Sequence, residues 1–148
     1  MSQRQSVRAI VIHDGGLLVM KRNKAGLQYY TRVGGGIDPG EDQETALRRE
    51  LREETGMEVG MVRAVYYEDA GELYGLQHVY LCEYIGGNPV LSPESGEAAQ
   101  TADGKNTYEP MWLPLDQVSN VTFYSVPQSE ALLKGVRDGF PETLQELA

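Results

Sequence analysis

The stretch that decides the fold is GGIDPGEDQETALRRELREETGM, residues 35–57. Its first part is a loop rich in glycine and proline, and its second part, from about Asp42 to Thr55, consists of good helix formers. Asp42 is a suitable N-cap, and Gly56 is a suitable residue to end the helix. The stretch therefore predicts a loop followed by a helix whose apolar stripe is formed by Ala46, Leu47 and Leu51.

Three glutamates share one face of this predicted helix, because Glu50, Glu53 and Glu54 are spaced i, i+3 and i+4. Like charges at this spacing repel by roughly a few tenths of a kcal/mol per pair, so the carboxylates add nothing to helix stability. Mg²⁺ and Mn²⁺ prefer such hard oxygen ligands, usually together with phosphate oxygens and water. The alternative is a solvated face paired with the arginines of the same helix, which the glycine loop and Glu41 disfavour.

Short apolar or alternating runs predict strands in the rest of the chain, at residues 7–12, 17–21, 28–33, 62–67, 77–84 and 110–115. The first two runs flank the turn His13–Gly16 and predict a hairpin, and the fourth and fifth predict another. Residues 86–107 predict a long surface loop, and residues 127–136 a second helix before a polar tail. Short strands mixed with two helices indicate a layered α/β or α+β domain.

Composition limits the classes of partner. The chain has 148 residues, enough for one compact domain, and a net charge of −9, which disfavours broad electrostatic binding of nucleic acid. Its single cysteine, Cys82, forms neither an intramolecular disulfide nor a zinc cluster. No stretch approaches the about 20 apolar residues that span a bilayer, so we expect no membrane association and a cytoplasmic location. A polyphosphate substrate would need divalent cations to bridge the like charges.

Residues 35–57 resemble the Nudix box, which reads Gly, five residues, Glu, seven residues, then Arg-Glu-aliphatic-any-Glu-Glu-any-Gly-aliphatic. Every fixed position is filled, with Met57 as the final hydrophobe. Resemblance to the MutT-like Nudix hydrolase family implies an α+β fold of the α/β/α sandwich type, with a mixed central sheet flanked by helices and the box as loop-helix-loop. We expect a single such domain over residues 1–148.

The resemblance also implies an activity. Nudix hydrolases cleave a phosphoanhydride bond in a nucleoside diphosphate linked to another moiety, with Mg²⁺, or Mn²⁺ in its place, as cofactor. Nucleoside triphosphates, dinucleoside polyphosphates and nucleotide sugars are all expected small-molecule substrates, and a homodimer is a further expectation. The main alternative is a binding module of the same fold without turnover. Such modules commonly lose acids of the box, and all are present here.

The family's metal ligands match Glu50, Glu53, Glu54 and the backbone carbonyl of Gly34. Arg49 is expected to take part in catalysis by orienting these acids.

Gly35, Glu41 and Gly56 are expected to support the site structurally. Two positions depart from the commonest family form, since Val33 replaces a frequent proline and Asp38 a frequent glutamate. These departures affect the loop geometry and any metal contact from position 38.

The general base stays open between Glu50 and an acid of the long loop, Glu94 or Glu97, of which Glu94 is preferred. For the substrate, Tyr29 and Arg32 lead into the glycines and could stack on a base or contact phosphate. Tyr74 falls near the position where dinucleoside polyphosphate hydrolases carry a tyrosine.

Overall fold

The computed structural model describes residues 4–91 and 106–147. Its strands are β1 (Gln5–His13), β2 (Gly16–Lys24), β3 (Leu27–Thr31), β4 (Gly34–Gly36), β5 (Val59–Asp69), β6 (Leu76–Tyr84), β7 (Asn106–Pro114), β8 (Phe123–Tyr124) and β9 (Gln145–Leu147). Its helices are α1 (Gln43–Thr55), α2 (Gly71–Tyr74), the 3₁₀ helix η1 (Leu115–Asn120) and α4 (Val126–Asp138).

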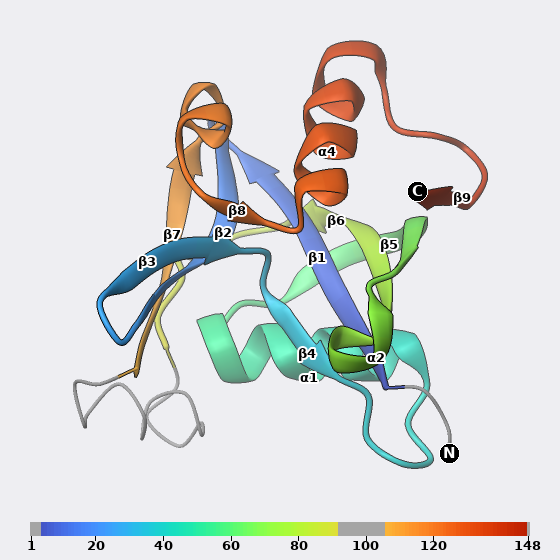
Figure 1. Cartoon of the computed structure of the whole chain (residues 1–148). Helices are drawn as coiled ribbons and strands as arrows, with labels where there is room; N and C mark the ends of the chain where they lie inside the picture. The colour runs from blue at the N-terminus through green and yellow to red at the C-terminus, as the bar shows by residue number, and fades with distance from the viewer. Residues whose placement is uncertain (1–3, 92–105, 148) are drawn as a thin grey trace.

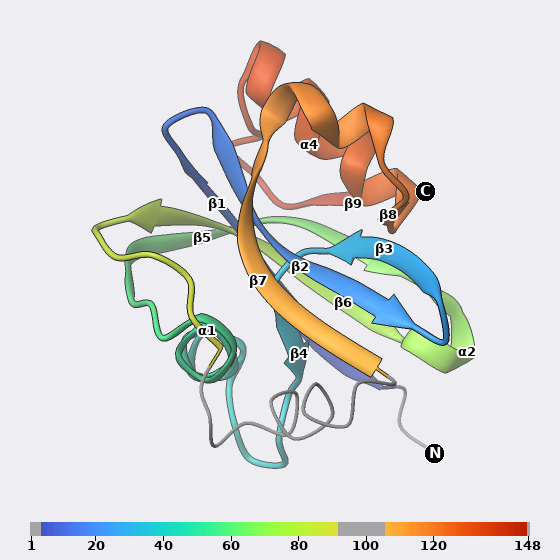
Figure 2. The same ribbon diagram turned by 90° about the vertical axis from the view of Figure 1, so that its left-hand side faces the viewer.

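The strands form one mixed sheet in the order β8-β3-β2-β1-β6-β5-β9, with β4 added to β1 and β7 added to β2. Strands β1 and β2 pair only next to their turn, at Ile12↔Leu17 and His13↔Gly16. Beyond that point β1 pairs with β4 and β6, whereas β2 pairs with β3 and β7. The sheet therefore splays open from the β1–β2 turn, as Figures 1 and 2 show, and β4 is added along β1.

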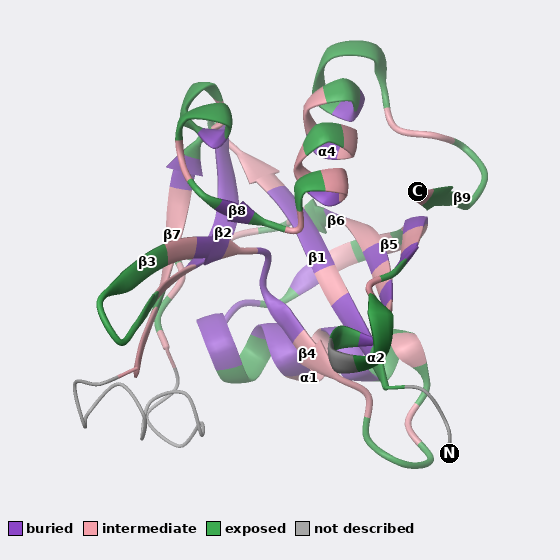
Figure 3. Ribbon diagram, viewed as in Figure 1, coloured by how far each residue is buried: buried purple, intermediate pink, exposed green. Residues whose placement is uncertain are grey.

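Helices α1 and α4 cover opposite faces of the sheet (Figure 1). Alternate residues of a strand face opposite ways, so β1 contributes to a hydrophobic core on each side. Val7, Ala9 and Val11 pack with Ala46, Leu47 and Leu51 of α1, while Ile10 packs with Val19, Val65 and Leu132 on the side of α4. Figure 3 shows buried positions on both sides of β1. The predicted α/β/α sandwich with a mixed central sheet is confirmed.

Helix α1 begins and ends as its sequence predicts. The side chain of Asp42 accepts a hydrogen bond from the backbone N–H of Thr45 at 2.8 Å, which is N-capping. At the other end Gly56 has φ 70°, and its N–H donates to the carbonyl of Arg52 at 2.9 Å. The caps fix the helix to the register that aligns its apolar stripe with β1.

Both predicted hairpins and the helix after residue 126 are confirmed. Several details differ. Strand β7 already starts at Asn106, inside the predicted loop, because its whole length pairs with β2. The short helix α2 interrupts the β5–β6 connection, the glycines form β4, and β9 arises in the expected polar tail by parallel pairing with β5. Within residues 4–91 and 106–147, no helix has the length and apolar character to cross a bilayer.

Candidate active site

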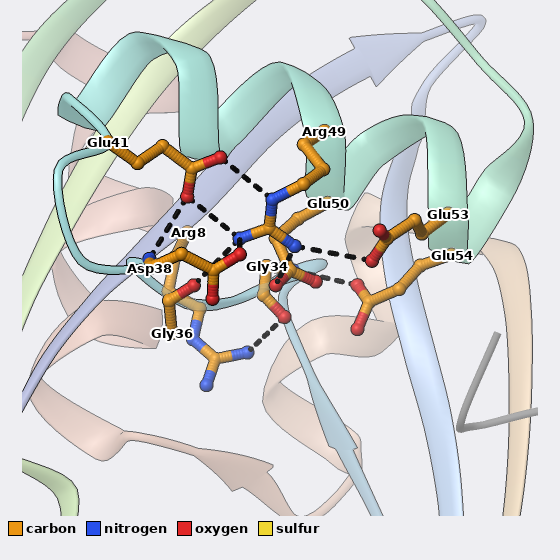
Figure 4. A network of polar contacts seen from close by, with 9 residues as sticks. All are labelled: Arg8, Gly34, Gly36, Asp38, Glu41, Arg49, Glu50, Glu53 and Glu54. Atoms are coloured by element: carbon orange, nitrogen blue, oxygen red, sulfur yellow. Dashed lines mark hydrogen bonds and ion pairs between the residues drawn. The ribbon is translucent and has the colours of Figure 1, made fainter.

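The site is built where β4, which pairs with β1, meets α1, and Figure 4 shows its side chains. The N–H of Gly34 donates to Glu54 Oε2 at 2.9 Å. Gly34 has φ +152°, and a Cβ there would lie 1.9 Å from the carbonyl oxygen of Val7, so only glycine fits. At Gly35 a Cβ would lie 2.6 Å from the carboxylate of Glu50. The glycines therefore bring the backbone into direct contact with two carboxylates of α1.

Arg49 ties the loop before α1 to the acids on the helix. A guanidinium has five N–H donors, and all five are used here. Two bonds of 2.8 and 2.9 Å reach Glu41, and one of 3.0 Å reaches the carbonyl of Gly36. The remaining two reach Glu50 Oε1 at 3.1 Å and Glu53 Oε2 at 3.3 Å. The bidentate contact between Arg49 and Glu41 fixes the loop before α1 relative to the helix.

The hydrogen bonds from Arg49 lower the pKa of Glu41 to about 2, with a further contribution from the backbone N–H of Asp38. The same pair raises the pKa of Arg49 above its usual value. Both groups are therefore charged at neutral pH. The sequence expectation that Glu41 and Arg49 orient the acids matches this placement, although their roles in turnover stay predictions.

The three glutamates of the box are not equivalent. Glu50 and Glu54 are buried, at 8% and 5% exposure, whereas the side chain of Glu53 is 48% exposed and turned toward Arg49. In the part of the chain that the structure describes, no three acidic, histidine or cysteine side chains converge as a metal cluster would. The donor set nevertheless consists of oxygens alone, two carboxylates beside a backbone carbonyl, which is the chemistry that Mg²⁺ or Mn²⁺ selects.

Tyr29 and Tyr74 lie on different elements, a strand and a short helix. Tyr29, on β3, is half-buried and meets the ring of Tyr124 edge to face at 5.3 Å between centroids. Tyr74 is 59% exposed at the end of α2. The proposed contacts of both residues with substrate stay predictions.

Arg32 lies on the other side of the sheet from the acids of α1, and its expected contact with a phosphate stays a prediction. Its side chain is 1% exposed and points to the side of α4, where Nη2 donates to Gln128 Oε1 at 2.7 Å. Burial lowers the pKa of Arg32 to about 9. The guanidinium of Arg32 is therefore held by Gln128 on the side of α4. Glu94 and Glu97 lie outside the described residues.

Sequence reasoning missed Arg8, which lies on the other side of β4 from α1 (Figure 4). Its Nη1 donates to the carbonyl of Gly34 at 3.3 Å and to that of Arg32 at 3.2 Å. Arg8 sits between Val7 and Ala9, which are both fully buried. A charged residue inside an otherwise apolar strand was the signal that could have identified it.

Fold and site together define a class of protein in which a glycine strand meets the acidic face of a helix. The model of the NUDIX domain matches residues 2–134. The chain therefore belongs to the NUDIX family, which confirms the resemblance of residues 35–57 and the expected class of enzyme, a Nudix hydrolase.

Solved structures agree with the fold. A MutT structure from work on Aliivibrio salmonicida and Vibrio cholerae is 20% identical, covers 89% of this chain and 98% of its own, and has a TM-score of 0.69. The MutT NUDIX hydrolase of Burkholderia pseudomallei is 24% identical over 78% of this chain and 86% of its own, with a TM-score of 0.61. An ADP-ribose pyrophosphatase of Streptococcus suis is 17% identical over 98% and 99%, with a TM-score of 0.69.

Proposed function

We propose that the protein hydrolyses a phosphoanhydride bond in a nucleoside diphosphate linked to another moiety, using Mg²⁺ or Mn²⁺. The observation that carries the proposal is the approach of Gly34 and Gly35 to two buried carboxylates. Glu54 binds the N–H of Gly34, and the carboxylate of Glu50 fills the space that a Cβ at Gly35 would need. Buried carboxylates are costly unless a cation or hydrogen bonds compensate their charge.

In this proposal the cation is held by the Gly34 carbonyl together with Glu50, Glu53 and Glu54. When bound, it lowers the pKa of water and neutralises charge on the phosphate oxygens. Glu53 would join by turning from Arg49, to which it is bound at 3.3 Å with half its side chain exposed.

The remaining chemistry falls to protein groups. Arg49 holds Glu50 in place through the 3.1 Å bond, and Glu41 fixes Arg49 in turn. Glu50 is one candidate to accept the proton of the attacking water, and Glu94 or Glu97 are the others. Positioning and charge stabilisation of this kind account for most of the catalysis in phosphoryl transfer.

For the substrate, we propose a nucleotide whose base lies near Tyr29. The edge-to-face contact of Tyr29 with Tyr124, which is 52% exposed, leaves an aromatic surface that a base could stack against. The names of similar structures, an ADP-ribose pyrophosphatase and a UDP-X diphosphatase, support a nucleoside diphosphate with a variable second group. We also propose that the protein is cytoplasmic. We further propose that it forms a homodimer, and light scattering of the purified chain would test its oligomeric state.

The decisive experiment is a screen of the purified protein against nucleoside triphosphates, dinucleoside polyphosphates, ADP-ribose and UDP-sugars with Mg²⁺ or Mn²⁺. Release of phosphate, pyrophosphate or nucleoside monophosphate identifies the bond that is cleaved. With the best substrate, we expect Glu53→Gln and Glu54→Gln to reduce turnover by about two or more orders of magnitude.

Glu44→Gln is the matched control, because Glu44 is exposed on the same helix and pairs only with Arg48 among the ion pairs of the described residues. It should leave turnover unchanged. Full turnover in both Glu53→Gln and Glu54→Gln, with far-UV circular dichroism showing an intact fold, would refute the proposed site. Tight nucleotide binding without any product would favour the binding module instead.

A further inference from the structure

The guanidinium of Arg8 lies across β4 from the acids of α1, and the proposed hydrolysis does not use it. Strand β1 pairs Arg8 with Gly34 in antiparallel register. Nη1 of Arg8 is shared between two carbonyl oxygens, those of Gly34 at 3.3 Å and Arg32 at 3.2 Å. Figure 4 shows the Gly34 peptide between Glu54 on one side and Arg8 on the other.

Gln77 holds Arg8 in this position from the neighbouring strand β6. Its Oε1 accepts a hydrogen bond from Arg8 Nε at 3.0 Å, and its Nε2 donates to the carbonyl of Tyr74 at 2.8 Å. The second bond fixes which end of the amide faces Arg8. Because Gln77 is 6% exposed, the arrangement is held by packing as well as by hydrogen bonds.

The positive charge of Arg8 interacts electrostatically with Glu50 and Glu54. Burial lowers its pKa, and the charges of Glu54 and Glu50 act in the opposite direction. A charge removed from water is weakly screened, so its effect on a second cation nearby is large. The acids of α1 therefore already have a partial counter-charge from the opposite side of β4.

The bonds of Arg8 to the carbonyls are long and shared, whereas the Glu54 bond to the N–H of the same Gly34 is 2.9 Å. Bonds of such length are the weaker ones and are exchanged more readily. The Gly34 carbonyl is also the backbone oxygen assigned to the cation under the proposed function. Two positive groups at one oxygen repel each other.

We propose that Arg8 and the divalent cation compete for the Gly34 carbonyl, so that Arg8 limits how tightly the protein binds the cation. This inference rests on the proposed metal site. Arg8 acts as a resident counter-ion of the acids, and cation binding turns its Nη1 away from Gly34. The released donor is then free to meet an anionic group of the substrate.

The test measures Mn²⁺ binding to the full chain by electron paramagnetic resonance, without substrate. Arg8→Gln removes the charge and keeps an amide that can bond Gln77, so we expect Mn²⁺ to bind about tenfold more tightly than to the wild type. Arg8→Lys keeps the charge and should bind Mn²⁺ within about twofold of the wild type. Arg137→Gln, an equal charge change at an exposed site on α4, should not alter binding.

Equal or weaker binding by Arg8→Gln would overturn the inference, since it would mean that Arg8 positions the carbonyl for the cation. Failure of the wild type to bind Mn²⁺ at all would instead overturn the proposed metal site, and the inference with it. A measurement on the wild type covers the case in which Arg8→Gln does not fold. Titration with Mg²⁺ should shift the Nε–H resonance of Arg8 in nitrogen-15 spectra, and an unchanged resonance at saturation would contradict the displacement.

Discussion

Arg49 is the residue on which the loop and the acids both depend, because its five donors reach Glu41, Glu50, Glu53 and the carbonyl of Gly36. We expect Arg49→Lys to lower the free energy of unfolding by about 1–3 kcal/mol, since an ammonium cannot reproduce the planar two-pronged contact with Glu41. Urea unfolding measures the change. Arg52→Lys, on the exposed face of the same helix, is the control and should be close to neutral; equal losses in both variants would contradict the special role of Arg49.

Glu41 gives the same network a pH dependence. Its pKa falls from the usual value of about 4.5 to about 2 in the folded chain. A carboxyl with a lowered folded pKa stabilises the fold above its unfolded pKa and loses that contribution as pH falls through the folded value. Thermal melts should therefore show Glu41→Gln less stable than the wild type at pH 6, with a difference that shrinks between about pH 4.5 and pH 2. A difference that stays constant across this interval would show that the charge of Glu41 is not responsible.

At the scale of elements, β4 depends on the absence of side chains at its glycines. A Cβ at Gly35 would meet the flexible end of the Glu50 side chain at 2.6 Å, whereas one at Gly36 meets nothing within 4 Å. We expect Gly35→Ala to displace the Glu50 carboxylate and reduce kcat by about tenfold or more, with a small loss of stability. Gly36→Ala should keep both kcat and the melting temperature. Equal activity in the two variants would show that the packing of Glu50 against β4 does not matter for turnover.

The two elements of the site differ in how far the sequence could predict them. Helix α1 was predictable, because its caps Asp42 and Gly56 and its apolar stripe are local features. Strand β4 was not predictable, because three glycines have no strand propensity. They adopt an extended conformation through pairing with residues 6–8 of β1. Likewise β9 forms only through its pairing with β5, far away in the chain. Local sequence features therefore predict helix α1, which carries the acids. Strand β4, whose backbone contacts these acids, depends on pairing with a distant part of the chain.

At the scale of the whole molecule, the side of the sheet that each residue faces decides its role. Val33 packs into the core below α1, so its neighbour Arg32 is directed to the face of α4. Proximity to the glycines in the sequence predicts a contact of Arg32 with substrate, and the chain direction between β3 and β4 places its side chain beside Gln128. Arg8 was overlooked for the converse reason, because it is distant in sequence from residues 35–57 and meets them only through the pairing of β1 with β4.

Arg32 instead joins a buried network that fastens α4 to the sheet. Gln128 Nε2 donates to Glu68 Oε1 of β5 at 2.9 Å, and Ser125 Oγ donates to the same oxygen at 2.7 Å. In the described part of the chain, Nε and Nη1 of Arg32 have no hydrogen-bond partner, so its bond to Gln128 is hard to replace. Removing one partner of such a buried pair costs more than removing both.

This asymmetry gives a quantitative test on the complete fold. Gln128→Leu should lower the free energy of unfolding by about 2–4 kcal/mol, because the guanidinium of Arg32 is left buried without its bond. Adding Arg32→Met to the Gln128→Leu variant should recover part of that loss. Two apolar side chains then pack together, and no unpaired charge is left buried. Urea unfolding of the two single variants and the double variant yields the coupling energy between the sites. Strictly additive losses would mean that α4 is held by its apolar contacts around Leu132 and not by this network.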